Sequence, residues 1–174
     1  GNRIFSAYRG EAEFLLEDGA LPHEIDAALE DYGFPMGLFA VYDMAGLEIA
    51  WARRKRQAAM RDPSERHVEI ADRLCEAGRL GQKSGRGWYA YPDGKRTIDP
   101  QVTAIIEAER AKRSIAARSF SQDEIQKRLL NAMAAEGETL LAEGIAARAS
   151  DIDLVMINGY GFPAHKGGPM FAKS

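Results

Sequence analysis

The chain has 174 residues, of which 45% are hydrophobic and 28% charged, and its formal net charge is -3. This composition is typical of a globular protein and excludes wholesale disorder, and the charge gives no reason to expect binding to nucleic acid. No apolar run approaches the roughly 20 residues that a membrane-spanning helix needs, so no membrane partner is expected. The single cysteine, Cys75, suits a reducing compartment, and we therefore expect a cytoplasmic location.

Hydrophobic residues at helical spacing predict five successive helices in the first half of the chain. Gly19 and Gly33 are typical residues to end the first two helices, and Pro22 fits the first turn of the second. The expected helices run from Ile4 to Gly19, from Pro22 to Gly33, from Pro35 to Gly46, from about Leu47 to Met60, and from Pro63 to Gly78.

The last of these helices is expected because Asp62, Pro63 and Glu65 match the residue types of a helix start. Cys75 falls in the apolar stripe of this helix, which predicts a buried packing residue and not a nucleophile. The basic run 53–56 in the preceding helix is interpreted as a solvated face.

The helical pattern of the first part of the chain is interrupted between residues 81 and 100. Residues 81–89 form a glycine-rich turn that leads into a short aromatic extended stretch, and residues 93–100 are typical of a joint. A helix begins at Pro100 and runs into the basic stretch 110–118, which we interpret as another solvated face. Residues 121–124 match a capping box, which predicts the start of one more helix.

A degraded internal repeat spans most of the chain. The first copy starts at Asn2 and the second at Lys127, and arginine, alanine, glutamate, a Leu-Leu pair and glycine fall in matching places. Both copies then pass through Ile-Asp into a Tyr-Gly-Phe-Pro turn, at 32–35 and at 160–163. Matched units of this kind argue for tandem, similarly folded modules.

The second copy stops soon after Phe171, whereas the first continues far beyond Phe39, so we expect the chain to be a fragment with a truncated second module. The predicted domains are a first helical module at 1–95, a linker helix at 96–120 and an incomplete second copy at 121–174. An incomplete module should leave apolar residues uncovered, which predicts self-association of the chain. The residues expected to be exposed are Leu129, Leu130, Leu140, Leu141 and the run 154–157.

The segment 159–164 matches the letters of a dinucleotide-binding fingerprint. That fingerprint needs glycines that open a helix and an acidic residue about twenty positions further on. The run 165–169 would interrupt any such helix, so we interpret the segment as the turn of the repeat. No cofactor-binding residue is therefore predicted in this chain.

Two weaker patterns concern bound ions. Residues 78–84 lack the Gly-Lys-Ser/Thr triplet of a phosphate-binding loop, and a packing turn is favoured over an anion nest flanked by Lys83 and Arg86. The three histidines, His23, His67 and His165, have no second ligand at metal-binding spacing, so no metal site is expected.

Taken together, the segments resemble the C-terminal portion of the 3-hydroxyacyl-CoA dehydrogenase family. The resemblance implies an all-α fold of tandem helical modules, related to the C-terminal domain of 6-phosphogluconate dehydrogenase, with the second module truncated. Two tandem copies are similar to the multifunctional fatty-acid oxidation enzymes, which also carry an enoyl-CoA hydratase domain. The matching pieces are 1–3, 25–26, 32–37, 43–47, 81–89, 143–146, 148–153, 158–163 and 167–171.

The resemblance implies oxidation of an L-3-hydroxyacyl-CoA to a 3-ketoacyl-CoA with NAD. In the family, NAD and a His–Glu general-base pair belong to an N-terminal nucleotide-binding domain, which is missing here, so the isolated chain is expected to be inactive. Asn2 is the counterpart of the family's active-site asparagine, and its amide is expected to hydrogen-bond the reacting oxygen of the acyl-CoA substrate. From the residues alone, a helix N-cap is the commoner role for such an asparagine.

Two points remain open from the sequence. The family usually has Met-Gly-Pro-Phe where this chain has residues 36–39 with leucine at 38, which keeps a backbone donor that proline would lack. This difference could shift the helix start and alter the surface that faces the acyl chain. The alternative function is a non-catalytic helical module that uses the repeat only for assembly.

Overall fold

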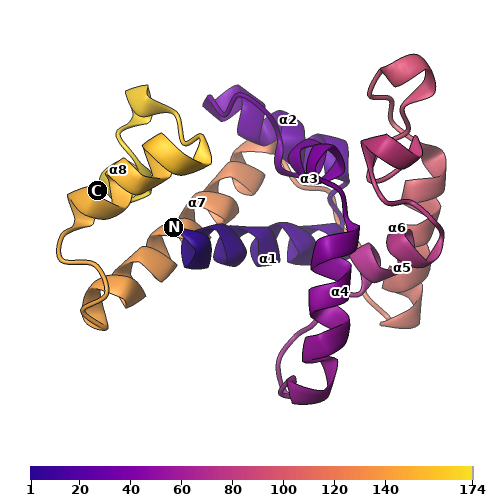
Figure 1. Cartoon of the computed structure of the whole chain (residues 1–174), viewed down its shortest axis with the longest axis horizontal. Coiled ribbons are helices and arrows are strands. Elements are labelled where there is room, and N and C mark those ends of the chain that lie inside the picture. The colour runs from indigo at the N-terminus through magenta and orange to yellow at the C-terminus, as the bar shows by residue number, and fades with distance from the viewer. Residues whose placement is uncertain (174) are drawn as a thin grey trace.

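The computed structural model describes residues 1–173 and is built from helices (Figure 1). Over those residues no β-strand forms, although isolated bridges join Gly81 to Arg86, Arg86 to Ala90 and Ala90 to Thr97. The predicted all-α fold class is therefore confirmed. The helices are α1 (Asn2–Asp18), α2 (Pro22–Tyr32), α3 (Leu38–Ala45), α4 (Glu48–Gln57), α5 (Ile70–Glu76), α6 (Pro100–Lys112), α7 (Gln122–Ala142), α8 (Ala149–Tyr160) and α9 (Pro169–Lys173). Short 3-10 turns occupy Ala58–Met60, Gln82–Ser84, Pro92–Gly94 and Ala164–Lys166.

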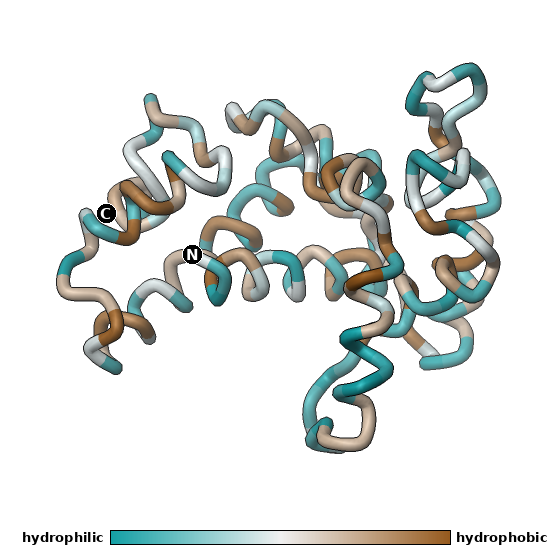
Figure 2. The backbone as a smooth tube through the Cα atoms, in the orientation of Figure 1, coloured by the Kyte–Doolittle hydropathy of each residue, from teal (hydrophilic) through white to brown (hydrophobic). Residues whose placement is uncertain are grey.

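Helices α1 and α7 lie side by side at the centre and run in roughly opposite directions (Figure 1). Ile4, Tyr8 and Leu15 share one face of α1 because their spacing follows the helical repeat, and each is at most 4% exposed. From α7, Leu129 and Met133 are fully buried. Hydrophobic stretches gather along these helices and near α2 and α3, whereas α4 is mostly hydrophilic (Figure 2).

The two sequence copies meet through reciprocal ion pairs. An arginine at the start of each copy reaches two carboxylates of the other, and the residues involved occupy matching places in the repeat. The ion pairs join Arg3 to Glu136 (2.7 Å) and Glu143 (2.8 Å), and Arg128 to Glu11 (2.7 Å) and Asp18 (3.2 Å). Each ion pair made by Arg3 thus has a counterpart made by Arg128 with the two copies exchanged. Such reciprocal contacts are typical of a self-complementary interface.

A buried carboxylate in each copy caps a helix that follows later in the chain. Asp26 in α2 accepts from the backbone N–H groups of Phe39 (2.9 Å) and Ala40 (3.0 Å) in the first turn of α3. These bonds fix the start of α3 at Leu38 and not at the predicted Pro35, because the Asp26 carboxylate satisfies the free N–H groups of the first turn.

Asp153 in α8 repeats this arrangement. It accepts from the backbone N–H groups of Met170 (2.7 Å) and Phe171 (3.2 Å) at the start of α9. A glycine precedes each capped helix, and a Cβ on it would lie 2.2 Å from the Cβ of Asp26 at Gly37 and 2.4 Å from that of Asp153 at Gly168. The carboxylate therefore reaches the helix start only because the glycine has no side chain.

The glycine-rich stretch 81–89 is anchored by a third buried carboxylate. Asp43 accepts from the backbone N–H groups of Trp88 (2.8 Å) and Tyr89 (3.0 Å), and from the hydroxyl of Tyr91 (2.7 Å). A Cβ at Gly87 would lie 2.1 Å from Oδ1 of Asp43. The stretch is thus a packing element against α3.

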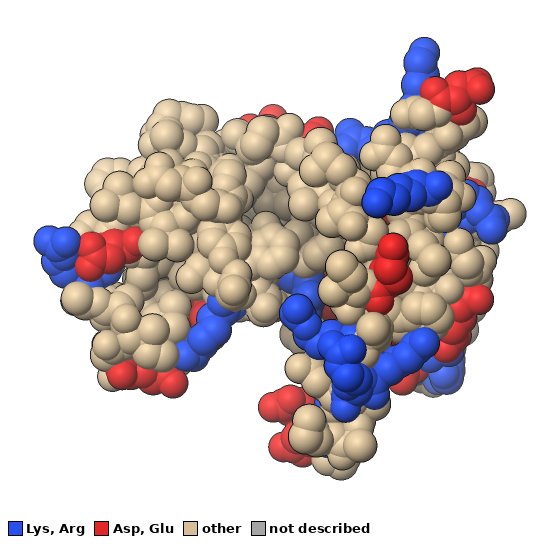
Figure 3. All heavy atoms as spheres, viewed as in Figure 1, with Lys and Arg blue, Asp and Glu red and all other residues tan. Residues whose placement is uncertain are grey.

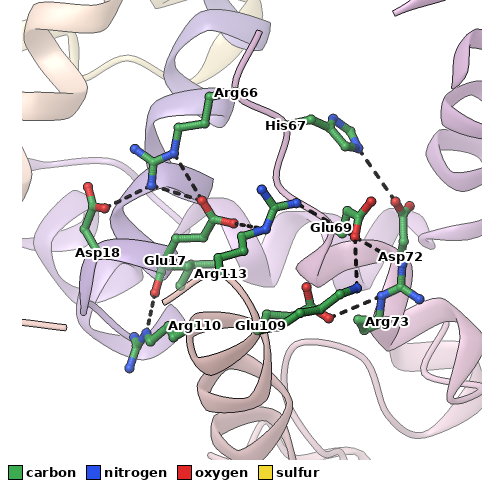
Figure 4. A network of polar contacts seen from close by, with 12 residues as sticks. Glu17, Asp18, Arg66, His67, Glu69, Asp72, Arg73, Glu109, Arg110 and Arg113 are labelled. Carbon is green, nitrogen blue, oxygen red and sulfur yellow. Dashed lines mark hydrogen bonds and ion pairs between the residues drawn. The ribbon is translucent and has the colours of Figure 1, made fainter. Parts of the chain in front are cut away.

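The predicted helix from Pro63 to Gly78 is wrong in its first half, since α5 begins only at Ile70. Asp62 instead accepts from the backbone N–H (2.9 Å) and hydroxyl (2.7 Å) of Ser64, which closes a local turn. Arg66 then donates to Glu17 (3.0 Å) and Asp18 (2.9 Å) at the end of α1 (Figure 4). These contacts hold the segment in an extended path.

The buried carboxylate of Glu17 stabilises the extended segment that precedes α5. Its side chain is 1% exposed and carries a carboxylate that needs compensating charge. Arg66 approaches one carboxylate oxygen and Arg113, just after α6, lies 3.2 Å from the other (Figure 4). The loop before α5 and the end of α6 are therefore both fixed to the end of α1.

The segment predicted as a linker helix contains α6, which contacts α1 and α5. Val102 and Ile106 are buried, and Arg110 donates to the carbonyls of Leu16 and Ala20 at 2.9 Å each. This packing places α6 beside the first copy. The domain boundaries proposed from the sequence stay a prediction.

The expected exposure of leucines in the second copy is largely wrong. Leu129 and Leu140 of α7 are 0% and 5% exposed, because α1, α2, α8 and α9 pack against that helix, whereas Leu154 remains 56% exposed. Cys75 is buried, as predicted. In the described part of the chain, none of the helices has the length and apolar character required to cross a membrane.

We expect Gly37→Ala and Gly168→Ala to lower the free energy of unfolding by roughly 1–3 kcal/mol, because the new methyl group would displace the capping carboxylate. Gly10→Ala in the open middle of α1 is the control and should stabilise by roughly 0.5–1 kcal/mol, since nothing lies within 4 Å of its Cβ position. Urea unfolding of the three variants measures these changes. Unchanged stability in Gly37→Ala would contradict the capping argument.

Arg128→Glu should destabilise the chain by roughly 1 kcal/mol, because it places a carboxylate against Glu11 and Asp18. Adding Glu11→Arg should recover part of the loss, which thermal unfolding can measure. Lys127→Glu is the matched control, since the Lys127–Asp123 pair has side chains that are 71% and 70% exposed and should contribute little. Equal losses in Arg128→Glu and Lys127→Glu would refute a specific role for the reciprocal pairs.

Candidate functional site

Asn2 lies in the first turn of α1, next to the second copy. Gly1 is the N-cap of α1 and no side chain caps the helix, so the N-cap role considered for Asn2 is not the one observed. The Asn2 side chain instead accepts, through Oδ1, a hydrogen bond from the hydroxyl of Tyr160 at the end of α8. Its amide nitrogen has no hydrogen bond to another residue in the described part of the chain and is free to donate.

A groove adjoins each partner of this contact. The larger, about 620 Å³, runs between the start of α1 and the region from Leu140 to Val155, and Asn2 lines it. The smaller, about 320 Å³, is mostly apolar and is lined by Tyr160 together with Phe5, Met36 and Leu38. Figure 3 shows a surface with few charged side chains here, hollowed between α8 and the α2–α3 region.

The two Tyr-Gly-Phe-Pro turns pack against each other beside the smaller groove, which Phe34 and Pro35 of the first turn and Tyr160 and Gly161 of the second line. The rings of Phe34 and Phe162 pack edge to face at 5.4 Å between centroids. A Cβ at Gly33 would lie 2.9 Å from Cβ of Pro163, so the turns approach closely because this residue is a glycine. The turns that match in the sequence repeat are therefore also in contact with each other in the structure.

The fingerprint-like segment 159–164 ends a helix and does not begin one. Gly161 has a φ of 73° and caps α8, and the N–H of Phe162 after it donates to the carbonyl of Met156 (3.1 Å). A pyrophosphate requires the free N–H groups at the start of a helix, which this segment does not supply. These residues do not fit NAD, in agreement with their interpretation as a turn.

The loop 78–84 is closed on itself. The N–H of Gly81 donates to the carbonyl of Arg86 (2.8 Å), that of Ser84 to Gly81 (3.2 Å) and that of Leu80 to Oγ of Ser84 (3.1 Å). These donors are used within the loop, which favours the packing turn over the anion nest. Among residues 1–173, no group of three or more histidine, cysteine, aspartate or glutamate side chains could hold a metal ion.

Ionisable groups near Asn2 are engaged elsewhere. Arg3 pairs with Glu136 and Glu143, and a hydrogen bond from Arg148 lowers the pKa of Asp151, which also lines the larger groove. Their chemistry is that of fixed charges and not of a general base. The site can therefore bind and orient a substrate oxygen through Asn2, but a base must come from outside these residues.

Glu13 lies on the same side of α1, three turns further along. Although the residue is partly exposed, its side chain lines a small cavity with Arg9, Tyr42 and Arg54. Burial raises the pKa of its carboxyl to about 7, against the opposing effect of the two arginines. It lies eleven positions along the helix from Asn2, which is roughly 16 Å and too far for proton transfer to the same substrate atom.

Tyr160 is the residue that the sequence did not single out. Its hydroxyl touches Asn2 across 158 positions of sequence, and the repeat presented it only as part of a turn. Tyr160 could have been identified by assuming that the two copies pair, because that pairing brings the turn of the second copy to the start of the first copy.

Comparison with known proteins gives a consistent picture. A model of the C-terminal domain of 3-hydroxyacyl-CoA dehydrogenase matches residues 1–91. The chain is 44% identical over 188 residues to the peroxisomal bifunctional enzyme of Homo sapiens, covering 100% of this chain and 26% of that protein. It is 34% identical over 177 residues to a peroxisomal fatty acid beta-oxidation multifunctional protein of Arabidopsis thaliana, covering 98% and 24%. The chain thus spans about a quarter of the length of these curated relatives.

A solved structure supports the same relation. The dehydrogenase part of multifunctional enzyme 1 from C. elegans superposes with a TM-score of 0.74 at 27% identity. The match covers 96% of this chain and 37% of that one. The helical arrangement described above is therefore shared with that protein.

Because the folded-state pKa of Glu13 lies above its ordinary value of 4.5, the fold favours the protonated form, and this contribution is lost as pH rises through about 7. Glu13→Gln should therefore raise the free energy of unfolding by roughly 2 kcal/mol at pH 8 and change it little at pH 5. Urea unfolding at both pH values measures this, with Glu65→Gln at an exposed position as the control. The same gain at both pH values would contradict the assignment.

Proposed function

Since the chain belongs to the 3-hydroxyacyl-CoA dehydrogenase family, we propose that it forms the substrate-side part of an enzyme that oxidises an L-3-hydroxyacyl-CoA to a 3-ketoacyl-CoA. NAD is the electron acceptor in this proposal, and fatty-acid β-oxidation is the process that it serves. A second activity in the same gene product, that of an enoyl-CoA hydratase, would agree with relatives named bifunctional or multifunctional.

The observation that carries the proposal is the free amide nitrogen of Asn2, which lines the larger groove and contacts Tyr160 of the smaller one. An N–H donor can bond the C3 oxygen both as a hydroxyl and as the carbonyl that forms, which holds the reacting carbon in one orientation. The bond strengthens as the base removes the hydroxyl proton and negative charge develops on the oxygen, so it favours the transition state. The adjoining apolar groove suits an acyl chain.

The cofactor and the base belong elsewhere in this proposal. No segment described above fits NAD, and the charged groups nearest Asn2 are held in ion pairs. We propose that a nucleotide-binding domain of the same gene product binds NAD and supplies the base, and that it faces the grooves beside Asn2. The chain alone is then inactive.

The alternative of a non-catalytic assembly module draws on the α1–α7 pairing, which needs no substrate. The position of Asn2 in an accessible groove, with its amide nitrogen free, favours the enzyme. Self-association of the chain is also proposed, through the exposed Leu154 and Val155. For the compartment, the names of the relatives favour peroxisomes over the cytoplasm expected from the sequence.

In the full-length gene product, Asn2→Ala should lower kcat roughly 10²-fold with little change in NADH affinity, because the lost bond is to the reacting oxygen. Reduction of acetoacetyl-CoA, followed by NADH absorbance, measures kcat, and calorimetry measures the NADH affinity. Ser6→Ala, one turn further along α1 and exposed, is the control and should retain turnover. Full turnover in a folded Asn2→Ala variant would favour the assembly module.

A further inference from the structure

Tyr160 is held over the start of α1 by its surroundings. It is the last residue of α8, and Gly161 follows it in the left-handed conformation that ends the helix. Its ring packs against Phe5 with centroids 5.9 Å apart. A Cβ at Gly1 would lie 2.3 Å from Cε2 of the Tyr160 ring, so the ring occupies space that any other residue at position 1 would fill.

The hydroxyl of Tyr160 acts on the orientation of Asn2. An asparagine amide presents an oxygen on one side and a nitrogen on the other, and rotation about its last torsion exchanges them. Donation from the Tyr160 hydroxyl to Oδ1 favours the orientation in which the nitrogen points away from Tyr160. That nitrogen is the donor on which the proposed function depends.

The repeat supplies an internal comparison. Tyr32 holds the place of Tyr160 in the first copy, and its ring packs against Phe34 and Phe162. Its hydroxyl has no hydrogen bond to another residue in the range 1–173. At the place of Asn2 the second copy has Lys127, which pairs with Asp123 at 2.9 Å. A hydrogen-bonded tyrosine therefore accompanies the asparagine and is not a general feature of the turn.

We propose that Tyr160 is a positioning residue that keeps the Asn2 amide nitrogen directed at the substrate oxygen, so that the second copy completes the site of the first. This inference rests on the proposed function of Asn2. It assigns the second copy a part in turnover although that copy contributes no residue that itself bonds the reacting group. The relation has one direction, since no described residue of the second copy, up to Lys173, accepts a hydrogen bond from the hydroxyl of Tyr32.

The test uses the full-length gene product with acetoacetyl-CoA and NADH. Tyr160→Phe keeps the ring over Gly1 and removes only the hydroxyl, so the fold should persist. The fraction of correctly oriented amide should fall, and with it kcat, by roughly 3- to 10-fold, as expected for the loss of one neutral hydrogen bond. The NADH affinity and the melting temperature should stay near those of the unchanged protein. Tyr32→Phe is the matched control and should retain kcat.

A double-variant cycle separates this role from a structural one. In an Asn2→Ala background, Tyr160→Phe should cause no further loss of kcat, because no amide is left to orient. The same 3- to 10-fold loss in both backgrounds, or unchanged kcat in Tyr160→Phe alone, would overturn the inference while leaving the role of Asn2 intact. Full turnover in Asn2→Ala would instead overturn the proposed function and the inference with it.

Discussion

The pairing of α1 with α7 is the constraint on which the rest of the molecule depends. It buries the apolar faces of both helices and is locked at each end by an arginine that reaches two carboxylates of the other copy. With the two helices paired, Tyr160 at the end of α8 lies beside Gly1 and Asn2. The grooves and the hydrogen bond between Tyr160 and Asn2 are consequences of that placement.

Buried carboxylates join segments outside this pair: α2 to α3, α8 to α9, and α3 to the stretch 81–89. Asp26, Asp153 and Asp43 each accept two backbone N–H groups from a segment distant in sequence, so each replaces a missing hydrogen-bond partner at the start of a helix or a turn. Each also needs a glycine that leaves room for the carboxylate. Aspartate and glycine therefore act together in this fold, since each carboxylate reaches its N–H groups only where the glycine lacks a side chain.

The parts of the fold that could be predicted from the sequence are those with local causes. Gly19 ends α1, Pro22 begins α2 and the box at Ser121 opens α7, because each depends on residues within one turn. The start of α5 could not be predicted, since Arg66 takes a tertiary partner in place of helical ones. Asn2 could be assigned only through the family resemblance, and its contact with a residue 158 positions away depends on how the copies pack.

Joining the two copies in one chain changes how their pairing responds to dilution. Two separate chains that met through the same surfaces would dissociate as their concentration fell, whereas covalently linked partners keep an effective local concentration of roughly millimolar. Here the connecting segment is itself docked, because Arg110 of α6 binds the carbonyls of Leu16 and Ala20. The contacts around Asn2 therefore form at any protein concentration. They are lost only when the chain itself unfolds, and not through dissociation of two chains.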